Sequence, residues 1–494
     1  MKENHLFSFE VNRKTIGKSA ASSVLVQLLT RLKGLITMPI LTLLLAPAEL
    51  GTFNLILVTS SVVTPLITLN LTDGAGVLFA QEKNIDAISK MYNSILNLVL
   101  IITGCSCLIA LFYYIFFAQH DSNLLLISLL VLSNVAYKLP IFLLATYQKT
   151  EIILKNTFFK DIATAVFTVA LVYLGYSFTG MVLAIFVFQI LSSIQMYTKI
   201  YSNIIYSFHI DTVILKQLLK MSLPLLPVFF FSWIVQSSDS YFLAYFSGSE
   251  AVGKYSVIYG ISGVILSITF ALNFFWFPMS GRLWMENRNQ YMKVFTVVFA
   301  GMLTVLLASV CLFELNSNIL LTTFVRRTSY HDAYIIMGTI AFAFSMQVMI
   351  TLLTAPLYSN RNTKAIFSAY LVGGIINTIL NVILIPKTGI VGAAVSTAVA
   401  YLVIVIVMGI LNYRLAGFSF IDSRLKYIIP IFIAAWITFG WLREHISTLE
   451  ILITDVIFAT LAIIIVYKLG MRNEERDYIS TFIMNFRTKQ VQGA

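Results

Sequence analysis

Charged residues are scarce in this sequence. Asp, Glu, Lys and Arg together make up 11% of its 494 residues, whereas hydrophobic residues make up 59%. A soluble domain carries about 25% charged residues. So few charges cannot cover a water-facing surface, which excludes a soluble enzyme and a disordered chain. A polytopic membrane protein remains, because lipid replaces water around most of its surface.

Residues and motifs for metal or nucleotide chemistry are also scarce. The three cysteines, Cys105, Cys107 and Cys311, fall inside apolar runs without CxxC spacing, and the five histidines are scattered singly. This pattern excludes a disulfide scaffold and gives no metal site. The sequence contains no P-loop GxxxxGK[ST], no HExxH and no paired-carboxylate constellation. We therefore expect a protein that is not an enzyme, that holds no cofactor or metal, and that ATP does not drive directly.

The sequence is rich in unbroken apolar runs of about 20 residues, the length that an α-helix needs to cross roughly 30 Å of hydrocarbon. A membrane β-barrel would show alternating apolar and polar residues instead. The expected fold class is an all-α integral membrane protein with fourteen transmembrane helices. The predicted spans are 20–45, 51–71, 94–117, 124–147, 157–175, 179–197, 221–246, 253–275, 294–313, 334–357, 365–385, 389–411, 427–441 and 449–469.

The 33 basic residues outnumber the 22 acidic ones, and their positions test this division into spans. If the N-terminus is cytoplasmic, and residues at the ends of spans are counted with the adjoining segment, 25 basic residues belong to inner segments, five to outer loops and three to span interiors. Such a bias is what the positive-inside rule requires. Both termini are therefore expected in the cytoplasm. The excess of basic residues reflects topology, so no nucleic-acid partner is expected.

The chain also repeats itself. AELGTFNLI, after the first span, aligns with EAVGKYSVI, after the seventh, at an offset of 202 that matches Gly51 to Gly253. Gly180 and Gly392 match at an offset of 212, before the sixth and twelfth spans. Two six-helix halves that start on the same membrane side form a parallel repeat, a transporter architecture with the substrate between the halves. The expected parts are an N-terminal cytoplasmic segment 1–18, an N-lobe 19–197, an inter-lobe cytoplasmic loop 198–220, a C-lobe 221–411, two further helices 427–469 and a cytoplasmic tail 470–494.

Three basic residues lie well inside predicted spans, away from the span ends, where charges usually face a bundle interior or an aqueous cavity. On the first span, Gln27, Arg31 and Lys33 belong to a polar half of the helical wheel, and Arg31 falls near mid-membrane. Lys138 lies in the fourth span. We predict that these four residues bind substrate. In the alternative interpretation, residues 17–33 form an amphipathic helix on the cytoplasmic surface, and Lys138 extends to the inner interface.

Asp239, in the seventh span, is interpreted as the only carboxylate well inside one of the first twelve spans. It continues the i, i+4 polar face of Ser232 and Gln236. The residue is either a coupling site for H⁺ or Na⁺ or a polar partner for a neighbouring helix. Asn377 and Asn381 are expected to hydrogen-bond between helices. The excess of interior basic groups over this acid predicts a cavity that attracts phosphate or acidic sugar and repels organic cations.

Several segments resemble bacterial O-antigen and polysaccharide flippases, the polysaccharide-transporter branch of the multidrug/oligosaccharidyl-lipid/polysaccharide flippase superfamily. The resemblance covers nearly the whole chain. It is carried by Pro39 through AELGTFNLI, by SLPLLPVFFFSWIVQSSDSYFLAYFSGSEAVGKYSVI, and by INTILNVILIPKTGIVGAAVSTAVAYL. The last is the most specific, because such proteins commonly read N-x-x-x-N…IP-x-x-G-x-x-GAA there. Relatives often have Arg after the Asp of the seventh span, where this chain has Ser240.

The resemblance implies two six-helix lobes around a cationic cavity, two extra C-terminal helices, alternating access, and a multi-pass place in the bacterial cytoplasmic (inner) membrane. The implied cargo is a polyprenyl-diphosphate-linked oligosaccharide repeat unit for O-antigen or capsule. The chain is expected to act as a monomer alongside the polymerase and other polysaccharide-assembly proteins. Three alternatives stay open: a lipid II flippase, a multidrug/cation antiporter, and a membrane-embedded glycosyltransferase or polymerase.

Overall fold

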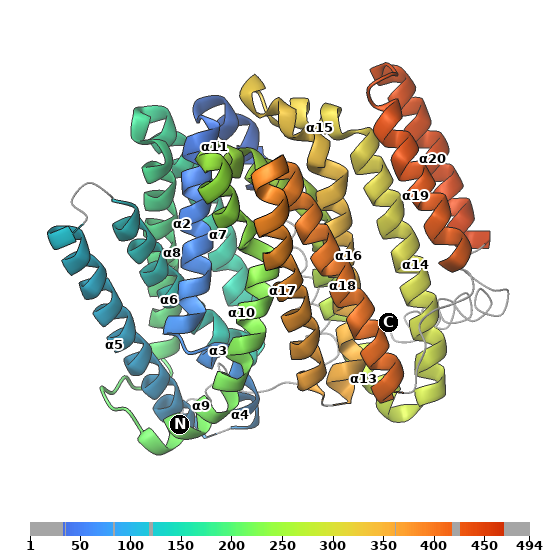
Figure 1. The fold of residues 1–494 in the computed structure, drawn as a ribbon. Helices are drawn as coiled ribbons and strands as arrows, with labels where there is room; N and C mark the ends of the chain where they lie inside the picture. The colour runs from blue at the N-terminus through green and yellow to red at the C-terminus, as the bar shows by residue number, and fades with distance from the viewer. Residues whose placement is uncertain are drawn as a thin grey trace, which may run out of the picture. The chain divides into compact units, whose positions relative to one another are not determined.

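The structure is a computed structural model, and it describes residues 33–34, 36–82, 84–117, 122–360, 362–416 and 425–468. All regular structure over these ranges is helical (Figure 1), which confirms the all-α fold class. The α-helices are α2 (Pro47–Ile67), α3 (Leu71–Gly74), α4 (Gly76–Gln81), α5 (Ile85–Phe117), α6 (Asn123–Thr146), α7 (Thr150–Leu171), α8 (Ser177–Tyr201), α9 (Thr212–Ser222), α10 (Leu226–Ser237), α11 (Asp239–Ser262), α12 (Ser267–Ala271), α13 (Phe277–Glu286), α14 (Arg288–Leu315), α15 (Ser317–Phe324), α16 (Met337–Ser359), α17 (Thr363–Thr388), α18 (Ile390–Ala416), α19 (Leu425–Leu442) and α20 (Thr448–Lys468). Short 3₁₀ or π segments join several of them: η1 (Val172–Tyr176), η2 (Leu223–Leu225), η3 (Gly263–Leu266), η4 (Leu272–Trp276) and η5 (Thr328–Ile336).

Ten helical stretches within these ranges are long and apolar enough to cross a membrane. Two of them, Thr150–Tyr201 and Thr212–Thr269, contain 52 and 58 residues, and each holds two of the predicted spans. The first predicted span lies largely outside the described residues, and α20 covers the last. The described helices therefore correspond to thirteen of the fourteen predicted spans, and the chain is a multi-pass membrane protein.

Glycines divide the two longest stretches. Gly175 has φ 92° and lies between the predicted spans 157–175 and 179–197. Gly248 has φ 82° and ψ 170°, and it lies between the predicted spans 221–246 and 253–275. Residues with a β-carbon rarely adopt such angles, whereas glycine does so freely. The chain can therefore turn back sharply at these two positions.

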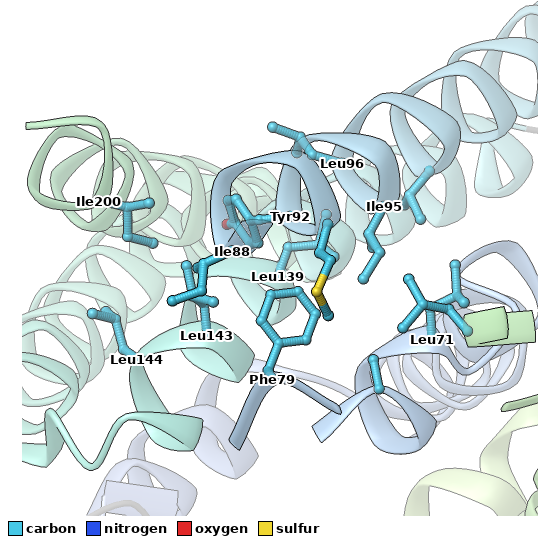
Figure 2. Packing of buried hydrophobic residues seen from close by; sticks show 14 of the residues in the cluster. Leu71, Phe79, Ile88, Tyr92, Ile95, Leu96, Leu139, Leu143, Leu144 and Ile200 are labelled. Atoms are coloured by element: carbon cyan, nitrogen blue, oxygen red, sulfur yellow. The ribbon is translucent and has the colours of Figure 1, made fainter. Parts of the chain in front are cut away.

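Two apolar cores hold the first part of the chain together. One core joins α3, α4, α5, α6, α8 and α9, and Figure 2 shows how Phe79, Ile88 and Tyr92 meet Leu139 and Leu143 of α6. The second core joins α2, α6 and α8. Its buried members are Leu45, Phe53, Ile56, Leu126, Leu130, Val172, Met181 and Val182. Because α6 and α8 contribute to both cores, they form the common frame on which α2 and α5 pack.

The chain forms two compact units, each with its own internal packing. The first unit comprises Met1–Gly260, Phe324–Tyr330 and Gly374–Ala393, and the second comprises the rest. The first unit runs past the predicted boundary between the lobes at 198–220, because α10 and α11 pack against α2. The division of the chain into an N-lobe and a C-lobe therefore stays a prediction.

In the second unit, the two C-terminal helices pack against α14 through a buried polar cluster (Figure 1). Glu314, at the end of α14, accepts hydrogen bonds from the Arg443 guanidinium and from Nε1 of Trp436, the latter at 2.9 Å. The side chains of Glu314 and Arg443 are only 8% and 10% exposed. Beyond this pair, Nδ2 of Asn316 donates to the Asp455 carboxylate at 2.9 Å. The cluster thus attaches both α19 and α20 to α14.

Candidate functional site

A cavity of about 310 Å³ lies between α2 and α10 in the first compact unit. α2 belongs to the predicted N-lobe and α10 to the predicted C-lobe, and a transporter built from a parallel repeat would hold its substrate between two such lobes. Its described lining residues are Leu57, Val58 and Ser61 of α2 and Phe229, Ser232, Trp233, Gln236 and Ser237 of α10. All of these residues are uncharged. The lining combines aromatic surface with hydroxyl and amide groups.

Aromatic side chains from the second repeat hydrogen-bond to hydroxyl groups on α2. Nε1 of Trp233 donates to Oγ of Ser61 at 3.1 Å, and the hydroxyls of Tyr241 and Thr59 lie 2.6 Å apart. The Trp233 and Tyr241 rings lie close together, with centroids 6.0 Å apart. An indole or phenol offers a broad apolar face and one polar edge. Such a surface suits an uncharged, hydroxyl-rich ligand such as a sugar.

Beyond one end of this cavity, the repeat-matched glycines come into direct contact. A β-carbon on Gly51 would lie 1.8 Å from the carbonyl oxygen of Ser249, and a β-carbon on Gly253 would lie 1.9 Å from that of Pro47. Pro47 and Ser249 are themselves related by the repeat offset of 202. The contact is therefore reciprocal, as a pseudo-two-fold axis between the two repeats requires. We call these four residues the glycine contact.

A second close approach lies beyond the other end of the cavity. A β-carbon on Gly74 of α3 would lie 2.6 Å from the α-carbon of Ser222, which is fully buried just before α10. Along the chain, the cavity residues of α2 fall between Gly51 and Gly74. The cavity residues of α10 fall between Ser222 and the glycine contact. The backbone therefore makes one close approach on each side of the cavity, at Gly74 and at the glycine contact.

Asp239, the predicted ion-coupling residue, is buried at the start of α11. Its exposed fraction is 1%, and its carboxylate accepts hydrogen bonds from the Tyr255 hydroxyl at 2.5 Å and from the backbone N–H of Ser240 at 2.8 Å. Next to it, Ser238 donates to Oδ1 of Asn377 at 3.1 Å, and Nδ2 of Asn381 donates to the same oxygen at 3.0 Å. The Ser238–Asn377 bond joins α10 to α17. It confirms the expected interhelical role of Asn377.

Lys33, a predicted substrate-binding residue, forms an ion pair with a buried acid. Its Nζ lies 3.0 Å from Oδ1 of Asp161 on α7, and Nζ of Lys160 lies 3.2 Å from the same oxygen. Asp161 is 7% exposed and lies near the middle of α7. Asp161 is therefore a second buried carboxylate, in addition to Asp239, in the first twelve predicted spans. Part of the interior positive charge is compensated by Asp161.

The other predicted substrate-binding residues are Lys138, Gln27 and Arg31. Lys138 is half-buried on α6, and its neighbour Tyr137 lies beside the ion pair, with the Lys160 Nζ 4.4 Å from its ring centroid. Gln27 and Arg31 lie outside the described residues. The roles of all four residues stay predictions.

The sequence prediction missed two features of the site. Asp161 was not singled out in the sequence, although the buried polar residues Asn156, Asp161, Thr164 and Thr168 follow one face of α7. That periodicity was a usable signal for a buried acid. The hydrogen bonds of Trp233 and Tyr241 to α2 had no such signal, because each joins residues more than 170 positions apart.

Comparisons with known proteins agree with this architecture. Residues 16–284 match the sequence profile of a family described as "Polysaccharide biosynthesis protein". An uncharacterized membrane protein of Methanocaldococcus jannaschii is 25% identical over 264 residues, which cover 51% of this chain and 51% of that protein. The alignment therefore spans about half the length of this curated relative.

Solved transporter structures share the fold at low sequence identity. Lipid II flippase MurJ, in an inward closed conformation, matches with a TM-score of 0.69 and 14% identity, over 92% of this chain and 99% of that one. An inward-facing multidrug resistance MATE transporter of the MOP superfamily matches with a TM-score of 0.58 and 13% identity, over 80% and 99%. The chain belongs to the polysaccharide biosynthesis protein family, and its fold is similar to those of the lipid II flippase MurJ and a multidrug resistance MATE transporter.

Proposed function

We propose that this chain is a flippase that moves polyprenyl-diphosphate-linked oligosaccharide repeat units, for O-antigen or capsule, from the cytoplasmic to the outer leaflet. The main support is the cavity between α2 and α10, which two repeated halves line with aromatic, hydroxyl and amide groups in a polysaccharide biosynthesis protein. The uncharged sugars would bind this lining, while the polyprenyl tail stays in lipid.

The diphosphate needs cationic partners to offset the loss of its hydration. We assign this role to Arg31, Lys33, Lys138 and Gln27. Lys33 would exchange its ion pair with Asp161 for a phosphate oxygen. Alternating access would then open the cavity to one side at a time, with the glycine contact closing the outer side. In this proposal the protein lies in the bacterial cytoplasmic membrane with both termini inside, and it acts as a monomer beside the polymerase and other assembly proteins.

Two other cargoes, lipid II and organic cations, are suggested by the solved transporters that share the fold. MurJ is a lipid II flippase of the same fold, and lipid II would present the same diphosphate and polyprenyl groups. A multidrug antiporter would need acidic groups at its binding site to hold organic cations. The described lining of the α2–α10 cavity contains no carboxylate, and Asp239 is buried in hydrogen bonds. We therefore rank the lipid II flippase as the second candidate and the antiporter behind it.

Deleting the gene in its native host tests the cargo. Polyprenyl-linked oligosaccharides should accumulate on the cytoplasmic side and surface polysaccharide should disappear, because assembly proceeds while transport stops. Mass analysis of the lipid-linked pool would identify the sugars. Accumulation of lipid II with normal surface polysaccharide would instead support the lipid II alternative. An unchanged lipid-linked pool would contradict both.

We also propose that Asp239 couples transport to an H⁺ or Na⁺ gradient. The Asp239→Asn variant keeps the side-chain shape but removes the charge. It should abolish the dependence of transport on the gradient, measured as uptake with and without an imposed ion gradient in vesicles. The control is Asp332→Asn, which removes an acid from η5 in the second compact unit. Wild-type gradient dependence in Asp239→Asn would refute the coupling role.

A further inference from the structure

A second cavity, of about 630 Å³, lies between α7 and α8, away from the α2–α10 cavity. This volume falls within the range of about 300–1,000 Å³ that is usual for small-ligand sites. Three lysines contribute to the lining: Lys155 and Lys199, and Lys160, whose charge is paired with Asp161. No carboxylate is found among the described lining residues. The cavity therefore has a net positive lining, which favours an anionic ligand.

The polar part of the lining includes a hydroxyl group that lacks a hydrogen-bond partner. Ser192 is 5% exposed, and its Oγ has no partner among the described residues. Buried hydroxyls are normally hydrogen-bonded, so an unpartnered one in a cavity wall indicates a missing ligand or water. Gln195, one turn further along α8, adds an amide to the same wall. An oxygen-rich anion would satisfy these groups together with the lysines.

The cavity changes from polar to apolar along the two antiparallel helices. Lys155 and Lys199 lie near the start of α7 and the end of α8, next to the connecting loops. At 1.5 Å per residue, Ala163 lies roughly 12 Å from Lys155 along α7, and Phe188 lies roughly 16 Å from Lys199 along α8. Phe159 also lines the cavity, and its side chain is 60% exposed. A charged end and an apolar end at this spacing match an amphiphile.

We propose that the cavity between α7 and α8 binds a membrane lipid with a phosphate-bearing headgroup. The phosphate oxygens accept hydrogen bonds from Lys155, Lys199 and the Ser192 hydroxyl, and the start of the hydrocarbon chain lies against Phe159 and Phe188. The headgroup belongs either to an anionic phospholipid of the bilayer or to a polyprenyl diphosphate. The proposal does not depend on the transported cargo, because it rests only on this lining and on the membrane location.

Binding of fluorescent phosphatidylglycerol and of a short-chain polyprenyl diphosphate to the purified full-length protein in neutral-lipid nanodiscs tests the proposal. The double variant Lys155→Gln/Lys199→Gln should weaken binding about 30-fold, because each lysine near a lipid surface contributes roughly a factor of five. The matched control is Lys216→Gln/Lys220→Gln, two exposed lysines of α9. This control removes the same charge and should change binding less than about twofold.

The steric variant Ala163→Trp fills the cavity and leaves every lysine in place. It should weaken binding as well, and a thermal unfolding curve like that of the wild type would show that the fold is intact. Tighter binding of polyprenyl diphosphate would assign the site to the carrier lipid, and equal or tighter binding of phosphatidylglycerol would assign it to the bilayer. The proposal would be overturned if the cavity and control variants lost lipid binding equally. It would also be overturned if inorganic diphosphate competed as strongly as the lipids do.

Discussion

Replacing Gly51 by leucine is expected to abolish transport while the protein still inserts into the membrane. The β-carbon alone would lie 1.8 Å from the Ser249 carbonyl oxygen, so α2 and α11 must separate. Overpacking of this kind costs about 1–3 kcal/mol. If the cost falls only on the conformation in which the glycine contact is closed, that conformation becomes about 5- to 150-fold less populated. Surface polysaccharide in a complemented deletion strain measures the effect.

Because Gly51 and Gly253 have equivalent places in the glycine contact, substitution of either should have the same effect. Gly253→Leu should give the same loss, because its β-carbon would meet Pro47 in the same way. Gly104→Leu is the matched control, since a β-carbon there has no neighbour within 4 Å. It should transport normally. Wild-type transport by either Gly51→Leu or Gly253→Leu would show that closing this contact is not part of the transport cycle.

Labelling of the cavity separates failed closure from general damage. In a background without Cys105, Cys107 and Cys311, a Ser232→Cys substitution places a thiol in the α2–α10 cavity. A membrane-impermeant thiol reagent added from outside should label this residue faster when Gly51→Leu is also present. Unchanged labelling together with lost transport would mean that the substitution acts elsewhere.

Removing Glu314 is expected to cause the largest loss of stability. Glu314→Ala would leave the buried Arg443 guanidinium with only the more distant, exposed Glu444 carboxylate, at 3.9 Å. Breaking one side of a buried ion pair costs about 3–5 kcal/mol. Because Glu314 also accepts the hydrogen bond from Trp436, the packing of α19 against α14 should weaken. A lower Tm of the detergent-solubilised protein, and faster proteolysis between α18 and α19, measure the effect.

A double-mutant cycle tests whether the ion pair itself causes the loss. Glu314→Gln keeps an acceptor for Trp436, and Arg443→Met removes the positive charge, so the double variant leaves no unpaired charge. It should recover most of the stability lost in Glu314→Ala, as expected for residues in direct contact. If Glu314→Ala is as stable as the wild type, the cluster does not attach the C-terminal helices.

Much of the fold could be predicted because its cause is local. Apolar runs of membrane-spanning length define the helices, and Gly175 and Gly248 mark two turns between them, where a positive φ is needed. The match between Gly51 and Gly253 was also visible as a repeat. The contact between these two glycines could not be predicted, because a repeat shows that two positions are equivalent but not how far apart they lie.

The charged parts of the site depend on contacts between distant positions, so they were harder to predict. Lys33 and Asp161 are 128 residues apart, and only the folded chain shows that they neutralise each other. Lys155, Lys160 and Lys199 lie in or next to predicted inner segments, where the positive-inside rule already accounts for basic residues. Their gathering around one cavity depends on how closely α7 and α8 pack, and no periodicity in either helix shows this.

The most direct test of the account is a flipping measurement with the purified protein. Proteoliposomes would carry a fluorescent polyprenyl-diphosphate oligosaccharide, and a quencher added outside would report how much headgroup crosses the bilayer. The account predicts crossing that requires the protein, that Gly51→Leu abolishes, and that unlabelled lipid-linked oligosaccharide competes against. Headgroup movement no faster than in protein-free liposomes, with transport of an organic cation by the same preparation, would contradict it.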